Sequence, residues 1–189
     1  MKHALAGLSS LILVAAVSCS TTPSFDQAQE LRAAKTLNPP PGQGVVVGRV
    51  KLEVTQTNLI HAGDGVLLTS RDGASYRVRA DSDGWFCVWL PVGQYQCESL
   101  VAYLGQPDGP VVGMCPRNEF HVEDQEVDYL GMLKAATRVE EAPIGYDMWI
   151  EVQYLRLVDE SAIVGRELAK RYPSATPTVR SALMSIEQP

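Results

Sequence analysis

Metal and acid–base chemistry would depend on histidines and carboxylates, and this sequence places few of them in the spacings that such chemistry needs. His61 and His121 are the histidines beyond the N-terminal region, and neither has a second histidine four residues away or a glutamate in a zinc-binding spacing. Asp81, Asp83 and Gly84 have part of the composition of a calcium loop, but an EF-type loop has a further oxygen ligand before its glycine. We therefore expect a tight turn here, no bound metal and no cofactor.

The sequence also contains no pattern typical of an enzymatic nucleophile or a phosphate-binding loop. No Gly-x-Ser-x-Gly elbow, glycine-rich phosphate loop or dinucleotide fingerprint occurs. The 16 Lys and Arg residues against 22 Asp and Glu residues give a net charge of −6, which argues against nucleic-acid binding. Because 46% of the residues are hydrophobic and 20% are charged, a globular core is expected. We predict that the protein is not an enzyme and has no catalytic residue.

The N-terminal 18 residues have the features of a secretory signal, since a basic start precedes an apolar run over residues 4–17 and a small residue ends it. Ala16-Val17-Ser18-Cys19 resembles the bacterial lipobox, in which the signal is cleaved before a cysteine that is acylated. The resemblance implies lipidation at Cys19 and durable anchoring in a lipid bilayer. The resemblance to lipoproteins of Gram-negative bacteria implies sorting to the outer membrane, because Ser20 and not an aspartate follows the cysteine. We expect the protein to face the periplasm. In a Gram-positive host the same signal would leave the protein on the outer face of the plasma membrane.

Three cysteines lie beyond the lipobox, and an exported domain favours disulfides among them. If strands 85–90 and 94–103 form a hairpin, one register joins Cys87 to Cys97 but places apolar residues opposite polar ones. The other register directs Cys87 outward and lets Cys97 join Cys115 across the next hairpin. We predict a disulfide at Cys97, and buried thiols are the alternative.

Three tryptophans, Trp85, Trp89 and Trp149, are the candidates for stacking against a ligand. A shared exposed groove would favour a site for a small or saccharide ligand. Burial of these rings would favour a purely structural role instead.

An acidic cluster lies in and between the predicted strands 119–123 and 127–133. It consists of Glu119, Glu123, Asp124, Glu126 and Asp128, with Glu140 and Glu141 nearby in the sequence. A basic partner would fit this cluster, but charge runs usually face water, and charged strand edges discourage aggregation of sheets. We therefore expect a solvated turn and strand edge.

Residues 19–43 are predicted to form the lipidated cysteine and a tether, after a signal peptide over residues 1–18. The capping box Ser24-Phe25-Asp26-Gln27 predicts a short helix over residues 25–37, which the following prolines end. The 24 residues from 20 to 43 would reach about 80 Å when fully extended, and less with this helix.

From residue 44 the sequence alternates in the manner of β-strands. The predicted strands are 45–54, 66–70, 76–80, 85–90, 94–103, 111–114, 119–123, 127–133 and 146–154. The Gly, Pro and Asp residues between them indicate an antiparallel β-sandwich over residues 44–158. A helical segment over 159–189 follows, with one helix from Asp159 to residue 172 and a terminal one over 176–184. We expect the first helix to dock on the sandwich, because so short a helix is marginal alone.

One segment carries a resemblance to a known fold family. Residues 81–95, with the sequence Asp-Ser-Asp-Gly-Trp-Phe-Cys-Val-Trp-Leu-Pro-Val-Gly-Gln-Tyr, resemble the signature of carboxypeptidase-regulatory-like domains. These are transthyretin-like or Ig-like all-β sandwiches, in which an Asp-Gly turn starts one strand and a Leu-Pro-x-Gly-x-Tyr corner starts the next. The resemblance covers about residues 44–135, and it implies an accessory or adhesive module without a reaction.

These features together predict a lipid-anchored envelope protein that acts as a non-enzymatic binding or assembly module. Its expected partners are the bilayer, through Cys19, and an envelope protein, with no nucleic acid. The alternative is a periplasmic domain that binds a small or saccharide ligand. An envelope hydrolase is the third and least favoured hypothesis.

Overall fold

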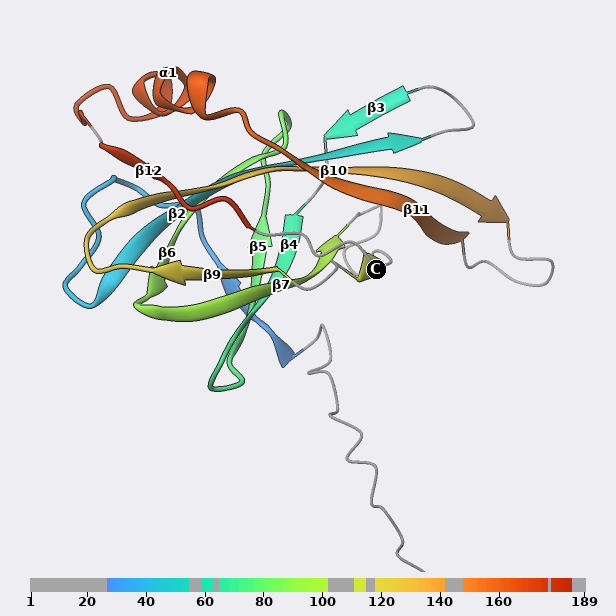
Figure 1. The fold of residues 1–189 in the computed structure, drawn as a ribbon, viewed down its shortest axis with the longest axis horizontal. Coiled ribbons are helices and arrows are strands. Elements are labelled where there is room, and N and C mark those ends of the chain that lie inside the picture. The colour runs from blue at the N-terminus through green and yellow to red at the C-terminus, as the bar shows by residue number, and fades with distance from the viewer. Residues whose placement is uncertain are drawn as a thin grey trace, which may run out of the picture.

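Alternating apolar side chains build two β-sheets that pack face to face, with a helix outside the second sheet (Figure 1). The computed structural model describes residues 27–54, 59–62, 65–101, 111–114, 118–141, 148–176 and 178–184. The predicted all-β fold of two packed sheets with a C-terminal helix is confirmed at this level.

In the part of the chain that the structure describes, the first sheet has six strands. Its order is β1 (Gln29–Leu31), β5 (Ser75–Arg79), β4 (Gly65–Ser70), β7 (Gly93–Val101) and β8 (Val111–Met114), and β9 (Glu119–Val122) also pairs with β7. Across the same described ranges, the second sheet also has six strands. Its order is β11 (Met148–Val158), β10 (Val127–Glu141), β2 (Gln43–Val54) and β3 (Leu59–Ala62), with β12 (Val179–Ser181) on β10 and β6 (Trp85–Pro91) on β2.

The sheets are mixed, so the predicted antiparallel arrangement is wrong. β10 runs parallel to both β2 and β12, and β1 runs parallel to β5. The consecutive strands β6 and β7 lie in different sheets and do not form the predicted hairpin. The alternation of side chains shows where strands are, but it does not show which distant strands pair.

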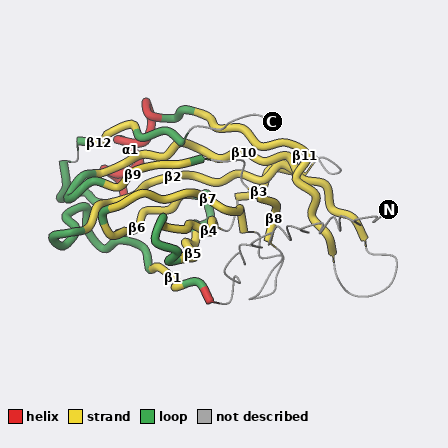
Figure 2. The backbone as a smooth tube through the Cα atoms, turned by 60° about the horizontal axis from the view of Figure 1, so that its bottom comes forward, coloured by secondary structure: helices red, strands yellow, loops and turns green. Residues whose placement is uncertain are grey.

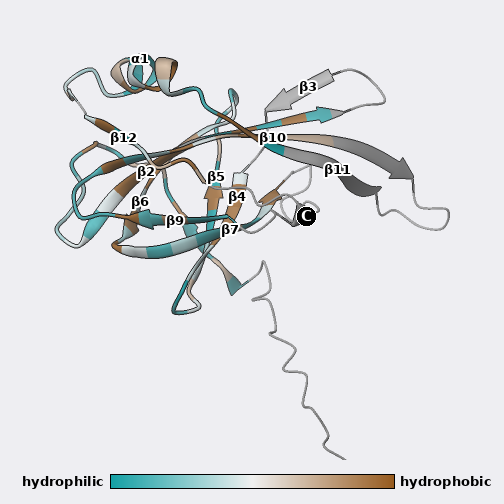
Figure 3. Cartoon of the chain, in the orientation of Figure 1, coloured by the Kyte–Doolittle hydropathy of each residue, from teal (hydrophilic) through white to brown (hydrophobic). Residues whose placement is uncertain are grey.

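The main core fills the space between the sheets, and one side of each strand supplies it. Figure 3 shows the hydrophobic stretches along the strands inside the body and hydrophilic ones in the turns. The core includes Val46, Val50 and Leu52 of β2, Phe86, Val88 and Leu90 of β6, and Tyr95 and Cys97 of β7. Each large aliphatic side chain buried here contributes about 1.5–3 kcal/mol to stability. The predicted inward direction of Phe86, Val88, Tyr95 and Cys97 is confirmed.

The outward face of the second sheet is also buried, beneath a layer that α1 (Ser161–Arg171) and an N-terminal strap form. The strap comprises residues 33–40. This second cluster joins Val45 and Val47 of β2, Trp85 and Cys87 of β6, Val127 and Tyr129 of β10, Val164 and Leu168 of α1, and Ala34 and Leu37 of the strap. The unbroken valine run at 45–47 is the sequence signal for this burial on both faces. The predicted docking of the helix is confirmed.

The helix expected over residues 25–37 is wrong for the part that the structure describes. Residues 29–31 form β1 instead, which extends the first sheet beside β5. Ala33 makes a bridge with Val88, and the Ala34 N–H donates a hydrogen bond of 2.8 Å to the Cys87 carbonyl. The segment therefore pairs with an edge strand of each sheet, and this pairing outweighs its local helix preference.

Of the two helices expected in the C-terminal segment, the first is present and the second is not. The helix starts at Ser161 with Glu160 at its N-cap, while Asp159 lies one residue earlier and accepts the Ser161 N–H at 2.8 Å. The helix expected over 176–184 is wrong, because residues 179–181 form β12 beside β10. Met184 then enters the main core, so residues after α1 close the sandwich.

Candidate functional site

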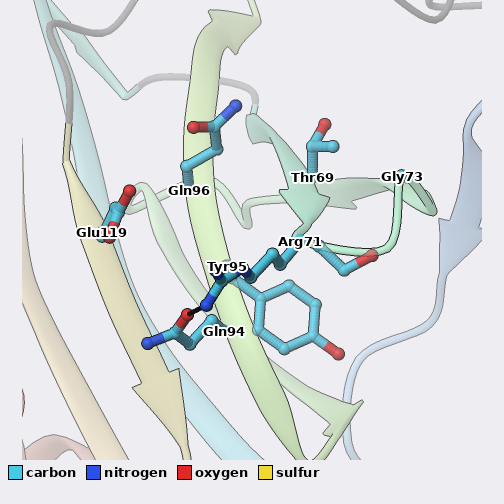
Figure 4. Close-up of a pocket in the computed structure, with 8 residues that line it drawn as sticks. Thr69, Arg71, Gly73, Gln94, Tyr95, Gln96 and Glu119 are labelled. Carbon is cyan, nitrogen blue, oxygen red and sulfur yellow. Dashed lines mark hydrogen bonds between the residues drawn. The ribbon is translucent and has the colours of Figure 1, made fainter.

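The solvent-facing side of β4, β7 and β9 contains an open depression of about 580 Å³ (Figure 4). Its lining residues are mostly polar: Thr69, Ser70, Arg71, Gly73, Gln94, Tyr95, Gln96 and Glu119. Strand alternation explains the lining, since Gln94 and Gln96 lie on either side of Tyr95, which belongs to the core.

Hydrogen bonds hold the central side chains of the depression in place. The Arg71 backbone N–H donates to the Gln94 carbonyl at 2.9 Å, and the Arg71 Nη1 donates to the Gln94 Oε1 at 2.9 Å. Figure 4 shows the Arg71 side chain extending towards Gln94. The Thr69 and Ser75 hydroxyl oxygens lie 3.2 Å apart. These contacts fix the guanidinium of Arg71 before any ligand arrives, which lowers the entropy cost of binding.

The adjacent β4–β5 turn is held by a serine. The Ala74 N–H donates to the Ser70 Oγ at 3.0 Å, and the Ser70 hydroxyl donates to the Asp72 carboxylate. This hydrogen bond from Ser70 lowers the pKa of the Asp72 carboxyl below its usual range. Asp72 therefore keeps its negative charge beside Arg71 at neutral pH.

The described lining residues supply hydrogen-bonding groups and none of them is a histidine or a cysteine. They offer one guanidinium, two primary amides, hydroxyl groups and one carboxylate. This mixture of donors and acceptors suits a polar ligand with several hydroxyl or amide groups. Sequence reasoning missed these residues, because polar residues on alternate strand positions look the same on any solvated face.

The predicted stacking tryptophans lie elsewhere. Trp85 is buried in the second cluster, where its ring centroid is 6.5 Å from that of Tyr129 and the Arg49 guanidinium lies 5.0 Å from its ring. Trp89 is half-buried, and its indole N–H donates to the Thr36 carbonyl of the strap at 3.0 Å. The side chain of Trp149 lies outside the described residues. The two described tryptophans therefore hold the outer layer together and do not line the depression.

Polar contacts fix the start of α1 to the second sheet. The Arg49 Nη1 lies 3.2 Å from the Glu160 carboxylate, and the Arg49 Nε donates to the Asp83 carbonyl at 3.1 Å. The Glu160 N–H donates to the Tyr129 hydroxyl at 3.2 Å. Burial raises the pKa of Tyr129 to about 12, so this hydroxyl stays neutral in ordinary conditions.

The two described cysteines, Cys87 and Cys97, are buried on different sides of the second sheet. Cys87 is a free thiol in the second cluster, and burial raises its pKa to about 11. Cys97 lies in the main core, and its N–H donates to the Asn118 Oδ1 at 2.8 Å. The alternative Cys87–Cys97 pairing is therefore wrong, while Cys115 lies outside the described residues. At neutral pH the Cys87 thiol is protonated, so it is a poor nucleophile.

The acidic cluster is divided between the surface and the interior. Glu119, Asp124 and Glu126 are exposed, as expected. Asp128 is fully buried, and its carboxylate lies 2.6 Å from the Nε of Arg180 on β12. The predicted solvated edge is therefore wrong for Asp128, because β12 covers it. The side chains of Glu140 and Glu141 lie outside the described residues.

The Asp81–Gly84 segment forms the expected turn. The Asp81 Oδ1 accepts the N–H groups of Asp83 at 2.9 Å and Trp85 at 3.0 Å. Its other carboxylate oxygen pairs with Arg171 of α1. Gly84 has a φ of 83°, and a Cβ there would lie 2.1 Å from the Val50 carbonyl oxygen. The Asp81 carboxylate is thus occupied by the turn and by the helix.

Two further observations concern the described residues as a whole. No three of their histidine, cysteine, aspartate or glutamate side chains gather as they would around a metal ion. None of the helices in these ranges has the length and apolar character needed to cross a membrane. Cys19 lies outside the described residues.

Comparison with known proteins gives no relative for this chain. No protein-family model, no curated protein and no solved structure matches it.

Proposed function

We propose that this chain is a cell-envelope lipoprotein, anchored in the outer membrane by acylated Cys19, with its β-sandwich acting as a non-enzymatic binding or assembly module in the periplasm. The observation that carries the proposal is the Ala16-Val17-Ser18-Cys19 motif after an apolar run. The first residue that the structure describes, Gln27, follows this motif after seven residues.

The test of the anchor is incorporation of labelled palmitate into the full-length protein. The wild-type chain should carry the label and fractionate with the outer membrane. Cys19→Ser should remove the label and release the protein from the membrane fraction. Label that persists in Cys19→Ser would contradict the proposal, and Cys97→Ser provides a control that should keep the label.

The same proposal assigns the sandwich to the transthyretin-like class. It is supported by the corner at residues 91–95, where the Tyr95 hydroxyl donates to the Pro91 carbonyl at 2.8 Å. The Asp81 turn and the inward Phe86 side chain add to this support. An experimental structure with a different strand connectivity from that class would overturn the assignment.

A second candidate function is binding of a saccharide or similar polar ligand. The depression at Arg71, Gln94 and Gln96 favours it, because amides and a fixed guanidinium are suitable partners for hydroxyl groups. The outer face of the second sheet is covered by α1 and the strap, so the depression is on the open side of the sandwich.

This candidate is tested by titrating the folded protein with soluble cell-wall oligosaccharides and following amide chemical shifts. Shifts should concentrate in β4, β7 and β9. Gln96→Ala should weaken binding by about five- to tenfold, which corresponds to one lost hydrogen bond. Arg166→Gln, on exposed α1, should leave binding unchanged. Shifts centred on another surface would move the ligand site away from the depression.

A further inference from the structure

The C-terminal strand β12 pairs with a part of β10 that β11 leaves open. β2 pairs with one edge of β10, and β11 pairs with the other edge from Met132 onwards. β12 takes the remaining part of that second edge, at residues 127–129, in a parallel register. Figure 1 and Figure 2 both show it as a short strand beside β10. The chain thus adds one of its own segments to a strand edge, which is a common way for proteins to bind an extended peptide.

The segment that includes β12 inserts alternate side chains into the body. Ala182 packs against the main core and Met184 is 2% exposed within it, whereas the residue between them is exposed. The Ala182 N–H donates to the Tyr129 carbonyl at 3.0 Å, and the Met184 N–H donates to the Leu130 carbonyl at 3.3 Å. Backbone hydrogen bonds and two inward side chains therefore hold the segment as they would hold a bound peptide.

An acidic notch lies beside this edge, defined here as the carboxylates of Asp128 and Glu123. Asp128 is fully buried, and the Nε of Arg180 on β12 lies 2.6 Å from its Oδ1. The Arg180 Nη1 lies 3.4 Å from the Glu123 carboxylate, and its Nη2 donates to the His121 carbonyl at 3.3 Å. A buried carboxylate without a counter-ion is strongly destabilising. Any segment that takes the place of β12 must therefore bring a cation to Asp128.

Further carboxylates lie next to the acidic notch. Asp124 and Glu126 belong to the turn between β9 and β10, and both are exposed. A basic segment is attracted to such an edge and an acidic segment is repelled, so the charges select the kind of partner.

The pairing of β12 is short in comparison with the rest of the sheet. Its ladder covers Val179–Ser181, whereas β2 pairs with β10 over residues 127–137. Short elements with few buried side chains open at a lower free energy than the body of a domain does. Exchange of this segment for another one requires no rearrangement of the longer strands.

We propose that the acidic notch and the adjacent β10 edge form a binding site for an extended basic segment of a partner envelope protein, which pairs with β10 in place of β12. The inference rests on the proposed binding or assembly function and names the chemistry of the partner. Its segment carries an arginine opposite Asp128, a small residue two positions later and a long apolar residue four positions later. Arg180, Ala182 and Met184 have this spacing within the chain itself.

The test measures binding of a fluorescent synthetic peptide with the sequence of residues 178–184, Thr-Val-Arg-Ser-Ala-Leu-Met. The protein is the full mature chain with Cys19→Ser, which keeps it in solution, and fluorescence anisotropy gives the dissociation constant. This parent chain should bind the peptide weakly, because its own β12 competes at a high effective concentration. Arg180→Gln in the protein should strengthen binding about tenfold, since the competing segment loses its charge-assisted hydrogen bonds.

The matched control is Arg166→Gln, which removes the same charge from an exposed residue of α1. This variant should bind the peptide as the parent chain does, to within about twofold. The peptide that itself carries Arg180→Gln should bind the Arg180→Gln protein about tenfold more weakly than the original peptide does. Met184→Ala in the protein loosens the segment from its other end, and it replaces Arg180→Gln if that variant does not fold.

Hydrogen exchange of the parent chain tests the opening of the segment without any substitution at the site. The amides of Ala182 and Met184 should exchange at least about tenfold faster than those of the β2–β10 ladder. Equal protection of the two sets would overturn the proposal, because β12 would then leave only on global unfolding.

Two further results would also overturn the proposal. One is the lack of peptide binding to a folded variant with a loosened segment. The other is a concentration-dependent dimer of the full chain that does not bind the peptide, since a second copy would then be the occupant. Failure of palmitate labelling at Cys19 would instead contradict the anchor, so the two failures are distinguishable.

Discussion

At the scale of single residues, the packing of the main core depends on a glycine that leaves room for an aromatic ring. A Cβ on Gly48 would lie 2.3 Å from Cζ of the buried Phe86 ring. Gly48→Ala should therefore force the ring to move and lower the free energy of unfolding by about 1–3 kcal/mol. Urea denaturation of the two proteins measures this difference.

Gly165 is the matched control, because it lies in α1 and a Cβ there would meet no atom within 4 Å. Gly165→Ala should raise the free energy of unfolding by about 0.5–1 kcal/mol, since alanine favours a helix more than glycine does. If both substitutions had the same effect, the close approach of Gly48 and Phe86 would not be the cause.

The buried thiol of Cys87 predicts a loss of stability at alkaline pH. Its pKa in the folded protein is raised from 9.0 to about 11, first by burial. Below pH 9 both the folded and the unfolded thiol are protonated, so this contribution to stability is complete there. Between pH 9 and about 11 only the unfolded thiol loses its proton, and the free energy of unfolding falls by up to about 1.4 kcal/mol per pH unit.

Urea titrations at pH 7.5, 9 and 10 measure this dependence, and Cys87→Ala is the comparison. The variant should be less stable at pH 7.5 but should lose less stability between pH 9 and 10 than the wild-type protein does. Parallel curves for the two proteins would assign the alkaline loss to other groups, such as Tyr129, whose pKa is raised from 10.0 to about 12 and whose contribution to stability therefore starts to fall near pH 10.

At the scale of elements, α1 contributes to the fold through its two buried residues, Val164 and Leu168. Leu168 is 1% exposed in the second cluster, so Leu168→Ala should leave a cavity and cost about 2–5 kcal/mol. Arg166→Ala, on the exposed side of the same helix, should change stability by less than about 0.5 kcal/mol. Thermal unfolding of the two variants measures the contrast.

Deletion of everything after Val158 should have a larger effect than either substitution. It removes α1, β12 and the buried Met184, and it uncovers Trp85. The melting temperature should fall, and a dye that binds apolar surface should gain fluorescence. An unchanged melting temperature without dye binding would mean that the helix serves a partner and not the sandwich.

Elements that form through local interactions could be predicted from the sequence, whereas elements that depend on pairing with distant strands could not. Strands such as β4, β5 and β6 were predicted within one residue at each end, because alternation and turn residues are local signals. β1 and β12 were both predicted as helices, since a capping box and a Thr-Pro pair favour helix starts. Their pairing with β5 and β10 involves residues far away in the sequence, so no local pattern reveals it.

The candidate site was less predictable than the fold. Arg71 and Gln94 meet because β4 and β7 are neighbours in the first sheet, and the sequence does not state this pairing. Trp85 and Trp89 were predicted as ligand candidates from their residue type alone. Whether such a ring binds a ligand or fills a core depends on what covers it, and here α1 and the strap do.

At the scale of the whole molecule, the folded body includes residues 28–43, which the sequence assigned to the tether. Ala28, Ala34 and Leu37 are buried, so the predicted tether is largely part of the body. Removing residues 20–26 should leave the melting temperature within about 1 °C. Removing residues 20–40 should lower it by several degrees, because both sheet edges and the second cluster lose their cover.

Differential scanning calorimetry of the two shortened chains decides this prediction. Equal melting temperatures of the two shortened chains would mean that residues 28–40 act as a tether and not as part of the folded body. The body could then stand further from the proposed lipid anchor.

The strap and the C-terminal helix also set an order of events in folding. The Tyr172 hydroxyl donates to the Ala34 carbonyl at 2.8 Å, and Leu37 shares a cluster with Leu168, so the outer layer joins residues near both ends of the chain. Contacts between such distant residues form slowly, because a long loop must close first. The second cluster cannot form until α1 has left the ribosome or the translocation channel. Under the proposed export, the chain would stay incompletely folded until nearly all of it had crossed the membrane, so that its folding would finish in the periplasm.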